Sequence, residues 1–336
     1  MSKVAVIGAG AWGTALAIVL GRRERHEVML WAHEKDVCEK ISAHRLNELY
    51  LPGFTIPDCV HVTNDLSAAL QGVHGVVSVM PSHHTRRVFR EMARHIKPEM
   101  FIVSATKGIE NDTLLRMSQV ISEEVQRERG FLPRIGALSG PSFALEVAKG
   151  DPTAVTMATQ DTELATIVQR EFSDPTFRVY TNNDIIGVEM GGALKNVVAI
   201  AAGVCDGLGF GHNTIAALIT RGLAEITRLA VRCGAKPATL SGLAGMGDLV
   251  LTCTGGLSRN RTVGVELGKG RQLNDIIAGM HGMVAEGVLT TNAAVGLAKK
   301  MGVEMPITEQ MYAILHGGKP PRDAIRELMT RPGKVE

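Results

Sequence analysis

Three glycines near the N-terminus have the spacing of a dinucleotide-binding turn. Gly8, Gly10 and Gly13 follow the apolar run Val4–Ile7, and residues 14–20 then have the composition of a helix. The first glycine permits a tight reversal, the second leaves room for a pyrophosphate against bare backbone, and the third lets the helix pack closely on the strand. The phosphates would bind helix N-terminal amides. The placement of the motif after a strand predicts a dinucleotide site.

The residue expected to contact the adenosine ribose lies about 20 positions beyond Gly13. That position is His33, which cannot accept hydrogen bonds as a carboxylate does, and the nearby Lys35 offers a positive charge for a 2′-phosphate. Glu34 and Asp36 are close by, so NAD(H) stays open as the alternative. The sequence favours NADP(H) over NAD(H).

Further glycine-containing segments carry groups that can bind anions or move protons. They are Ser104–Glu110, Leu138–Ala144, Gly191–Asn196, Gly245–Asp248 and Gly255–Arg261. The first two follow predicted strands, so we expect them at the ligand-binding edge of an open α/β sheet, with a helix opening at Ser142. The third places Lys195 in an apolar helix. The last two supply the acid Asp248 and a basic, amide-bearing turn around Arg259.

The elements that must position these groups form two regions. Short apolar runs suited to a parallel sheet alternate with helix-period segments such as 85–96 and 113–129. This alternation predicts a doubly wound α/β fold. The predicted strands are Val4–Ile7, Glu27–Trp31, Gly75–Met80, Met100–Ser104, Ile135–Leu138, Thr153–Ala158 and Phe177–Tyr180.

The second region is predicted to be helical. Residues 185–204 are rich in glycine and alanine and lack proline, residues 216–233 have helical period, and few strand-like runs follow. At 336 residues the chain exceeds the size at which one core usually stops growing. We therefore expect a dinucleotide-binding domain at 1–184 and a helical substrate-binding domain at 185–336.

Composition narrows the class of partner. With 36 Lys and Arg against 34 Asp and Glu, the net charge of +2 gives no overall field for nucleic acid or an acidic membrane. The uncharged run 4–21 has the length of a signal peptide, but glycines break its centre and charge follows it, and it is short for a spanning helix. We expect neither nucleic-acid binding nor membrane insertion.

The cysteines indicate neither a disulfide framework nor a metal site. There are five of them, they are widely spread, and none forms a Cys-x-x-Cys pair. We therefore expect no metal and a reducing, cytoplasmic location. The apolar helical half is compatible with a homodimer.

The motifs together resemble the bacterial type of NAD(P)-dependent glycerol-3-phosphate dehydrogenase, and the resemblance covers nearly the whole chain. The segments that carry it, in order, are Gly8–Thr14, Lys107–Glu110, Ser139–Ala144, Lys195–Asn196, Asn213–Gly222 and Ser258–Arg261. The resemblance implies a Rossmann-like doubly wound sheet followed by an all-α domain of the 6-phosphogluconate-dehydrogenase-like type. It also implies reversible hydride transfer between NAD(P)H and dihydroxyacetone phosphate, giving sn-glycerol 3-phosphate for glycerophospholipid synthesis.

The resemblance also implies roles for individual residues. Lys195 would be the base that takes the proton of the C2 hydroxyl, with Lys107 and Asp248 also in the catalytic group. A lysine can serve near neutral pH once burial and a like charge lower its pKa, although a carboxylate such as Asp248 acts in the opposite direction. The substrate would contact Lys107, Gly140, Ser142, Lys195, Asp248, Thr252, Ser258, Arg259 and Asn260. The cofactor would contact Gly8, Gly10, Ala11, Trp12, Gly13, His33, Lys107, Ala144, Arg259, Val284 and Glu286.

Two other functions stay open at this point. One is another two-domain dehydrogenase, of the 3-hydroxyacyl-CoA or hydroxy-acid type, which would have no use for a phosphate-binding turn at Ser258–Asn260. The other is a non-catalytic NAD(P) sensor, because a fold alone does not fix a function. A sensor would bind cofactor without turnover, and replacing Lys195 would not alter that binding.

Overall fold

The computed structural model describes residues 2–22, 25–280 and 283–333. Packing divides the chain into two compact units. Unit 1 comprises Met1–Lys107 and Leu115–Glu189, and unit 2 comprises Gly108–Leu114 and Met190–Glu336. The division falls inside a long helix that begins at Ile185. Because the helical region starts at that residue, we keep 1–184 and 185–336 as the proposed domains.

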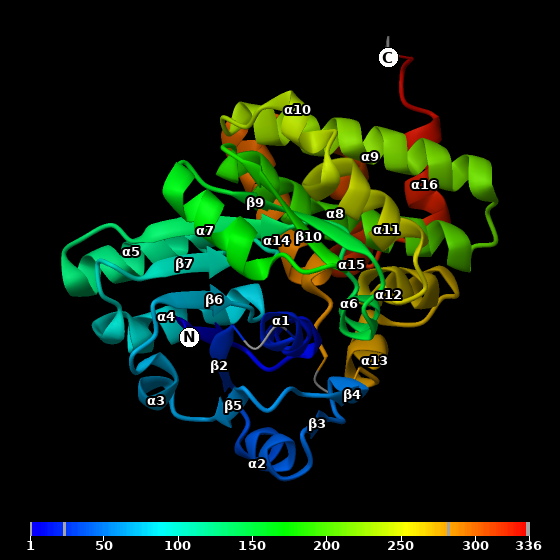
Figure 1. Cartoon of the computed structure of the whole chain (residues 1–336). Coiled ribbons are helices and arrows are strands. Elements are labelled where there is room, and N and C mark those ends of the chain that lie inside the picture. The colour runs from blue at the N-terminus through cyan, green and yellow to red at the C-terminus, as the bar shows by residue number, and fades with distance from the viewer. Residues whose placement is uncertain (1, 23–24, 281–282, 334–336) are drawn as a thin grey trace. The chain divides into compact units, whose positions relative to one another are not determined.

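Unit 1 is built on an eight-stranded sheet of order β10-β9-β8-β7-β6-β1-β2-β5 (Figure 1). All neighbouring pairs are parallel except β8 and β9, which are antiparallel. A two-stranded sheet pairs β3 with β4. The strands are β1 (Ser2–Ile7), β2 (His26–Trp31), β3 (Leu46–Asn47), β4 (Leu51–Thr55), β5 (Val60–Thr63), β6 (Gly75–Ser78), β7 (Phe101–Ser104), β8 (Arg134–Ser139), β9 (Thr153–Ala158) and β10 (Phe177–Asn182).

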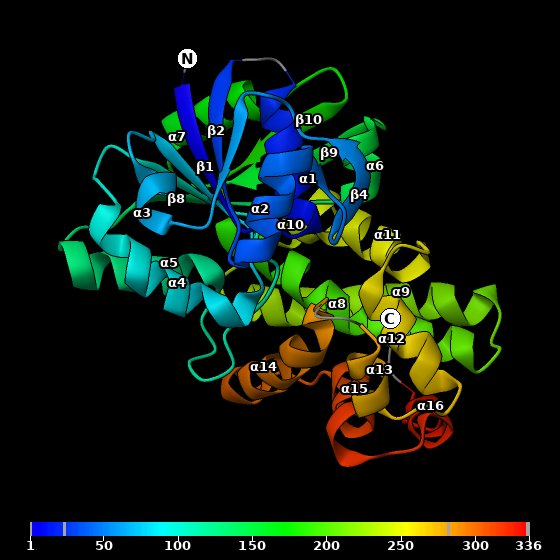
Figure 2. The same cartoon turned by 90° about the horizontal axis from the view of Figure 1, so that it is seen from below.

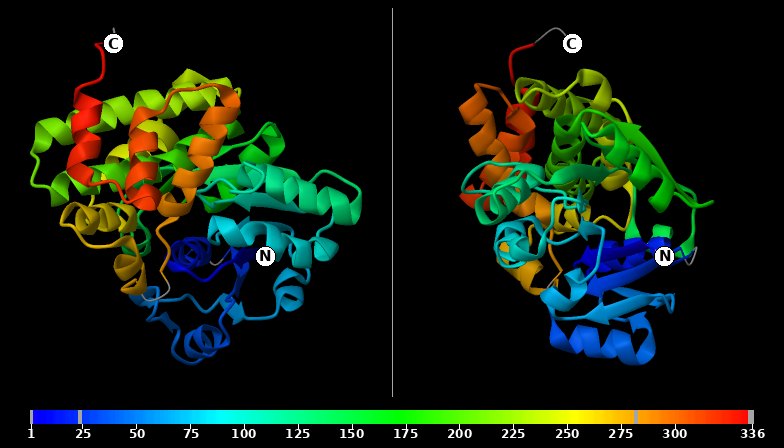
Figure 3. Two further views of the ribbon diagram at one scale, coloured as in Figure 1. Left: turned by 180° about the vertical axis from the view of Figure 1, so that it is seen from behind. Right: turned by 60° about the vertical axis from the view of Figure 1, so that its left-hand side comes forward.

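Helices cover both faces of this sheet, as the views in Figures 1 and 3 show. They are α1 (Ala11–Gly21), α2 (Lys35–His44), α3 (Leu66–Leu70), the 3₁₀ turn η1 (Ser82–His84), α4 (Thr85–Met92), η2 (Ala93–His95), α5 (Met117–Arg129), α6 (Ala144–Lys149) and α7 (Thr162–Phe172). Val4 and Val6 of β1 pack in one core with α1, α2, α6 and α7, whereas Ala5 and Ile7 pack in a second core with α3, α4 and α5. Alternate residues of a central strand are therefore buried on opposite faces, as a doubly wound sheet requires. The predicted fold class is confirmed.

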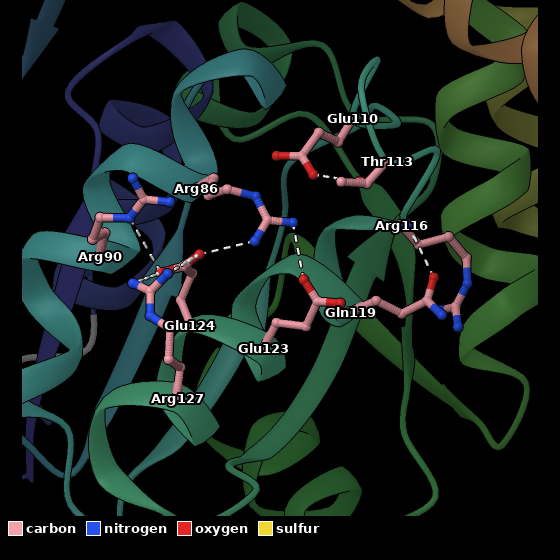
Figure 4. A network of polar contacts seen from close by, with 9 residues as sticks. All are labelled: Arg86, Arg90, Glu110, Thr113, Arg116, Gln119, Glu123, Glu124 and Arg127. Atoms are coloured by element: carbon pink, nitrogen blue, oxygen red, sulfur yellow. Dashed lines mark hydrogen bonds and ion pairs between the residues drawn. The ribbon is translucent and has the colours of Figure 1, made fainter.

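A buried carboxylate ties α4 to α5. Glu124 of α5 is 1% exposed and accepts hydrogen bonds from Arg86 and Arg127, and Arg90 lies 3.6 Å away as an ion pair. Figure 4 shows the three guanidinium groups pointing at this side chain. A buried charge is tolerated when it is paired and hydrogen-bonded, which is the case here. The network holds together two of the helices that cover one face of the sheet.

Among the described residues of unit 2, the regular elements are all helices. They are α8 (Ile185–Gly207, whose first turn belongs to unit 1), α9 (His212–Arg232), α10 (Pro237–Leu240), the π-helical turn η3 (Leu243–Gly247), α11 (Asp248–Thr254), α12 (Arg259–Gly268), α13 (Leu273–Ala278), α14 (Glu286–Met301), α15 (Pro306–Gly317) and α16 (Pro321–Met329). Figure 2 shows α9 lying along α8. The predicted helices at 185–204 and 216–233 are confirmed as α8 and α9.

Glycines bring α8 and α12 into backbone contact. A Cβ on Gly203 or Gly207 of α8 would lie 2.0 or 2.2 Å from carbonyl oxygens of α12. On α12, a Cβ on Gly264 or Gly268 would lie 2.0 or 2.6 Å from carbonyl oxygens of α8. Each helix thus has two glycines four residues apart on the face that meets the other helix. The glycine-rich composition that predicts a helical region therefore has a packing reason.

By length and composition, α8 is the one described helix that could cross a membrane, and the bent pair Pro237–Thr254 with Arg259–Gly268 would add a second span. In α8, 89% of the most apolar window is buried inside the protein, as in the core helix of a globular domain.

Candidate active site

The dinucleotide-binding turn lies between β1 and α1, at the point where the strand order reverses. The chain passes from β1 to β2 on one side, and β6 later pairs with β1 on the other. Ligands of open α/β sheets bind at such a switch point, outside the carboxyl ends of the strands. Gly8 has φ +121°, and a Cβ there would lie 2.3 Å from the Val79 carbonyl oxygen. Only glycine fits this reversal.

The other two glycines have the local geometry that the motif predicts. A Cβ on Gly13 would lie 1.8 Å from the Gly8 carbonyl oxygen, so Gly13 allows the first turn of α1 to pack against the loop. A Cβ on Gly10 would meet nothing within 4 Å. Gly10 is the N-cap of α1 and has no side-chain capping bond. Open space beside bare backbone at a helix N-terminus suits a phosphate group.

Trp12 and His33 lie near this turn on different elements. Trp12, in the first turn of α1, packs its ring 6.4 Å from that of Phe177, and its buried Nε1 has no hydrogen-bond partner among the described residues. His33 follows β2 and is exposed, with its ring 5.6 Å from that of Trp31. The buried unpaired donor and the open space at Gly10 both fit a polar ligand such as a dinucleotide.

Lys107, Gly140 and Ser142 come together after β7 and β8. Lys107 Nζ donates to the Gly140 carbonyl oxygen at 3.1 Å, and Ser142 Oγ donates to the same oxygen at 2.9 Å. Gly140 has φ +149°, and a Cβ there would lie 2.9 Å from Val155 Cα. The predicted helix start at Ser142 is wrong, because Ser142 belongs to this turn and α6 begins at Ala144.

A buried polar cluster forms around Lys195 in unit 2. Lys195, on α8, donates from Nζ to Asp248 Oδ1 at 2.5 Å and to Thr252 Oγ1 at 2.6 Å. The side chain of Lys195 is 8% exposed and that of Asp248 is 1% exposed. Asp248 and Thr252 are one turn apart on α11, so both face Lys195. The Thr252 hydroxyl also donates to the Asp248 carbonyl oxygen at 2.6 Å.

Close backbone packing makes this cluster possible. A Cβ on Gly191 would lie 2.5 Å from the Ala244 carbonyl oxygen, so this glycine lets α8 approach the π-helical turn η3. Asp248 follows η3 directly, and π-helical turns occur often at functional sites. The next residue to Thr252 is Cys253, and burial raises the pKa of its thiol to about 12. Cys253 is therefore neutral near pH 7 and does not compete with Lys195 for protons.

The Ser258–Asn260 turn begins α12. Ser258 is the N-cap, and its Oγ accepts from the Arg261 amide at 3.2 Å. Arg259 is exposed at the first helical position. Burial of part of its guanidinium lowers its pKa, while the charge of Glu286 acts in the opposite direction. Because arginine titrates far above neutral pH, Arg259 stays a cation in solution.

Asn260 differs from its neighbours because its side-chain amide forms hydrogen bonds within the protein. Its Nδ2 donates to Asn196 Oδ1 at 2.9 Å, and its Oδ1 accepts from the Gly287 amide at 2.9 Å. Asn260 thus links α8, α12 and the start of α14. Glu286 is the first residue of α14, and Val284 lies half-buried just before it.

The structure groups the predicted residues within each unit. In unit 1, Gly8, Gly10, Ala11, Trp12 and Gly13 form one turn, and Lys107, Gly140, Ser142 and Ala144 form a second group. In unit 2, Lys195, Asp248 and Thr252 form a cluster, with Ser258, Arg259 and Asn260 on the next helix. No sequence pattern indicates the hydrogen bond between Asn196 and Asn260, because the two residues are 64 positions apart. Among the described residues, no group of three or more His, Cys, Asp or Glu side chains is placed to hold a metal.

Comparison with known proteins identifies the family. A family profile described as NAD-dependent glycerol-3-phosphate dehydrogenase N-terminus matches residues 3–165, and its C-terminus counterpart matches residues 184–326. A protein of Koribacter versatilis named glycerol-3-phosphate dehydrogenase (NAD(P)+) is 68% identical over 336 residues, which are 100% of this chain and 99% of the relative. One of the same name from Acidobacterium capsulatum is 57% identical over 339 residues, with 100% of both chains covered.

A solved structure agrees with these matches. The crystal structure of glycerol-3-phosphate dehydrogenase from Coxiella burnetii has a TM-score of 0.93 to this chain at 41% identity, over 98% of this chain and 99% of that one. The family profiles for both halves of the chain, the named relatives and the solved structure all indicate the same family. The chain belongs to the NAD-dependent glycerol-3-phosphate dehydrogenase family.

Proposed function

We propose that this chain reduces dihydroxyacetone phosphate to sn-glycerol 3-phosphate with NAD(P)H, and catalyses the reverse reaction. Family membership makes it an NAD(P)-dependent oxidoreductase. The observation that carries the proposal is the buried cluster of Lys195, Asp248 and Thr252. An ammonium held between a carboxylate and a hydroxyl is a positioned proton donor, which ketone reduction requires at the carbonyl oxygen.

The residues of unit 1 fit a nicotinamide dinucleotide. Gly8, Gly10 and Gly13 shape the loop, and the N-terminal amides of α1 and Nε1 of Trp12 are donors for its polar groups. When bound, the reduced cofactor supplies a hydride to C2 of the ketone. The remaining predicted contacts, His33, Ala144, Val284 and Glu286, are proposed on family resemblance.

Lys195 would move the proton that accompanies the hydride. In the reduction, Nζ donates a proton to the C2 oxygen, so the ketone gains one hydride and one proton and becomes the alcohol. In the oxidation, neutral Nζ accepts the hydroxyl proton. Asp248 and Thr252 hold Nζ in place through their hydrogen bonds, so we propose them as orienting groups. On family resemblance, we propose Lys107 as a further positively charged substrate contact.

Arg259 would bind the substrate phosphate. Arg259 is an exposed residue at the start of α12, and a planar guanidinium binds phosphate oxygens through two parallel hydrogen bonds. Ser258 and the N-terminal amides of α12 add donors of the kind that bind anions. Gly140, Ser142 and Asn260 complete the proposed substrate contacts. The side-chain amide of Asn260 already forms hydrogen bonds with Asn196 and Gly287. We therefore propose that Asn260 acts mainly by holding the neighbouring Arg259 in place.

The finer properties are proposals as well. NADP(H) is favoured over NAD(H) because exposed His33, and not an acid, follows β2 at the ribose position. Glu34 is one residue further on, and its Oε1 lies 3.5 Å from the Tyr50 hydroxyl. We also propose a metal-independent, cytoplasmic enzyme that serves glycerophospholipid synthesis. The exposed apolar side chains of unit 2, among them Val231 and Tyr312, support a homodimer.

The decisive test follows the absorbance of NADPH, and then of NADH, when dihydroxyacetone phosphate is added to the full chain. Unphosphorylated dihydroxyacetone is the control substrate. We expect oxidation that depends on the phosphate group, and the two rates give the cofactor preference. Cofactor binding without oxidation would instead favour a sensor. Oxidation at an equal rate with the unphosphorylated ketone would contradict the proposed phosphate site.

A further inference from the structure

Asn47 reaches from the β3–β4 hairpin to the dinucleotide-binding turn. It is 1% exposed. Its Nδ2 donates to the Ala9 carbonyl oxygen at 2.8 Å and to Thr14 Oγ1 at 2.8 Å. Its Oδ1 accepts from the Tyr50 amide at 3.2 Å. The two donated bonds cross to residues 38 and 33 positions earlier in the chain, whereas only the accepted bond is local to the hairpin.

The Ala9 carbonyl oxygen is held from two sides. Thr14 Oγ1 donates to it at 3.3 Å and receives the second Asn47 bond. Thr14 lies on α1, so strand β3, helix α1 and the loop between β1 and α1 share one buried hydrogen-bond triangle. A rearrangement would leave at least one of these buried polar atoms without a hydrogen-bond partner, which is unfavourable, so the triangle resists rearrangement.

Fixing this oxygen also fixes the amide that follows it. In a trans peptide the C=O and N–H bonds point in opposite directions. With the Ala9 oxygen turned inward to Asn47, the Gly10 N–H must point away from Asn47. Gly10 is also the residue whose missing Cβ leaves open space. The loop therefore presents a preoriented donor beside the position where a phosphate fits.

We propose that Asn47 is a positioning residue for cofactor binding: through the Ala9 carbonyl it sets the Gly10 amide that receives the pyrophosphate. The inference rests on the proposed function, because it assumes that the turn binds a dinucleotide. A loop with a freely rotating Ala9–Gly10 peptide would have to be ordered during binding, and that ordering lowers affinity. Asn47 removes this cost in advance.

The test compares Asn47→Asp with the wild-type full chain. Aspartate keeps the shape and the acceptor for Tyr50, but it replaces the donor with a carboxylate that repels the Ala9 oxygen. We expect the Kd for NADPH, measured by fluorescence titration, to rise at least tenfold. The KM for dihydroxyacetone phosphate at saturating NADPH should change less than threefold, because the substrate contacts are elsewhere. Asn64→Asp, an exposed position of the same unit, is the matched control and should leave the Kd unchanged.

Thr14→Val separates positioning from charge and from general destabilisation. Valine is close in size to threonine and neutral, and it removes one of the two holds on the Ala9 oxygen. We expect a rise in the NADPH Kd of about threefold or more, while Thr14→Ser, which keeps the hydroxyl, stays within twofold of wild type. This pair decides the question if Asn47→Asp does not fold.

Three outcomes would overturn the inference. One is an NADPH Kd within twofold of wild type in folded Asn47→Asp. Another is an equal fold-increase in the NADPH Kd and in the KM for dihydroxyacetone phosphate in Asn47→Asp, which a merely structural role would give. The third is equal Kd values for Thr14→Val and Thr14→Ser. A wild-type chain that binds NADPH but does not reduce the ketone would refute the proposed function and leave the effect of Asn47 on the Kd testable.

Discussion

Replacing Gly264 with alanine tests how the α8–α12 contact supports the active site. The new Cβ would lie 2.0 Å from the Ile200 carbonyl oxygen and 2.8 Å from the Val204 amide nitrogen. Ordinary contact begins near 3.4 Å, so the two helices must separate by about 1.4 Å along that direction. Both obstructing atoms belong to backbone, and no side-chain rotation can relieve the overlap.

The expected cost follows from two opposing effects. Alanine gains about 1 kcal/mol over glycine in a helix interior, whereas overpacking a tight contact costs about 1–3 kcal/mol and at times more. Because the overlap is with backbone, we expect the upper end of that range and a net loss of about 2 kcal/mol of unfolding free energy. The shift also moves Arg259 of α12 relative to Lys195 of α8, and a misplacement of about 1 Å can cost roughly 100-fold in rate.

The assay is urea unfolding of the variant, together with kcat and KM for dihydroxyacetone phosphate. Gly317→Ala is the matched control, because a Cβ at the end of α15 would meet nothing within 4 Å. The control should be as stable as wild type or more so and keep full kcat/KM. If Gly264→Ala proves as stable and as active as this control, the close backbone contact does not hold the site together.

Three further predictions concern single side chains. Arg259→Ala should raise the KM for dihydroxyacetone phosphate by roughly 30-fold, equal to about 2 kcal/mol for a lost charge-assisted contact, and an unchanged KM in steady-state kinetics would place the phosphate elsewhere. Asp248→Asn should lower stability by about 3–5 kcal/mol in urea unfolding, because it leaves Lys195 buried without its carboxylate, and wild-type stability would contradict the pairing. Burial raises the pKa of Glu225 from 4.5 to about 7, although the hydrogen bonds that its carboxylate accepts from the Ile307 and Thr308 amides lower the pKa. Between those pH values the folded chain binds more protons than the unfolded chain, so the stability contributed by Glu225 is present below pH 4.5 and falls as pH rises to about 7. Compared with Glu225→Gln, wild type should lose up to about 3 kcal/mol between pH 4.5 and 7 in urea unfolding, and parallel pH profiles would contradict the prediction.

The local parts of the fold follow from sequence because their physical causes are local. The close packing at Gly13 depends on the Gly8 carbonyl oxygen of the same turn, so spacing alone predicts it. Strand β5 and the β3–β4 hairpin escaped prediction. Val60–Thr63 is only four residues long, and Leu51–Thr55 contains proline and glycine, so neither gives a clear strand period.

The sequence identifies candidate site residues but does not predict the hydrogen bonds among them. The resemblance indicates that Asp248 orients Lys195, but it gives Thr252 as a substrate contact and does not indicate that the Thr252 hydroxyl accepts from Lys195 Nζ. Asn260 is predicted as a substrate contact, but its amide bonds to Asn196 and Gly287. Such long-range pairs depend on how α8, α11, α12 and α14 pack, which in turn depends on glycines whose partners are far away in the chain.

We propose that Lys195 transfers the proton and that unit 1 binds the cofactor independently of Lys195. The most direct measurement compares Lys195→Met with exposed Lys299→Met in the full chain, recording the Kd for NADPH and the rate of ketone-dependent NADPH oxidation for each. We predict that Lys195→Met binds NADPH within a few-fold of wild type and loses turnover, whereas Lys299→Met keeps both. Near-normal kcat in Lys195→Met would contradict the role of Lys195 as the proton-transferring group.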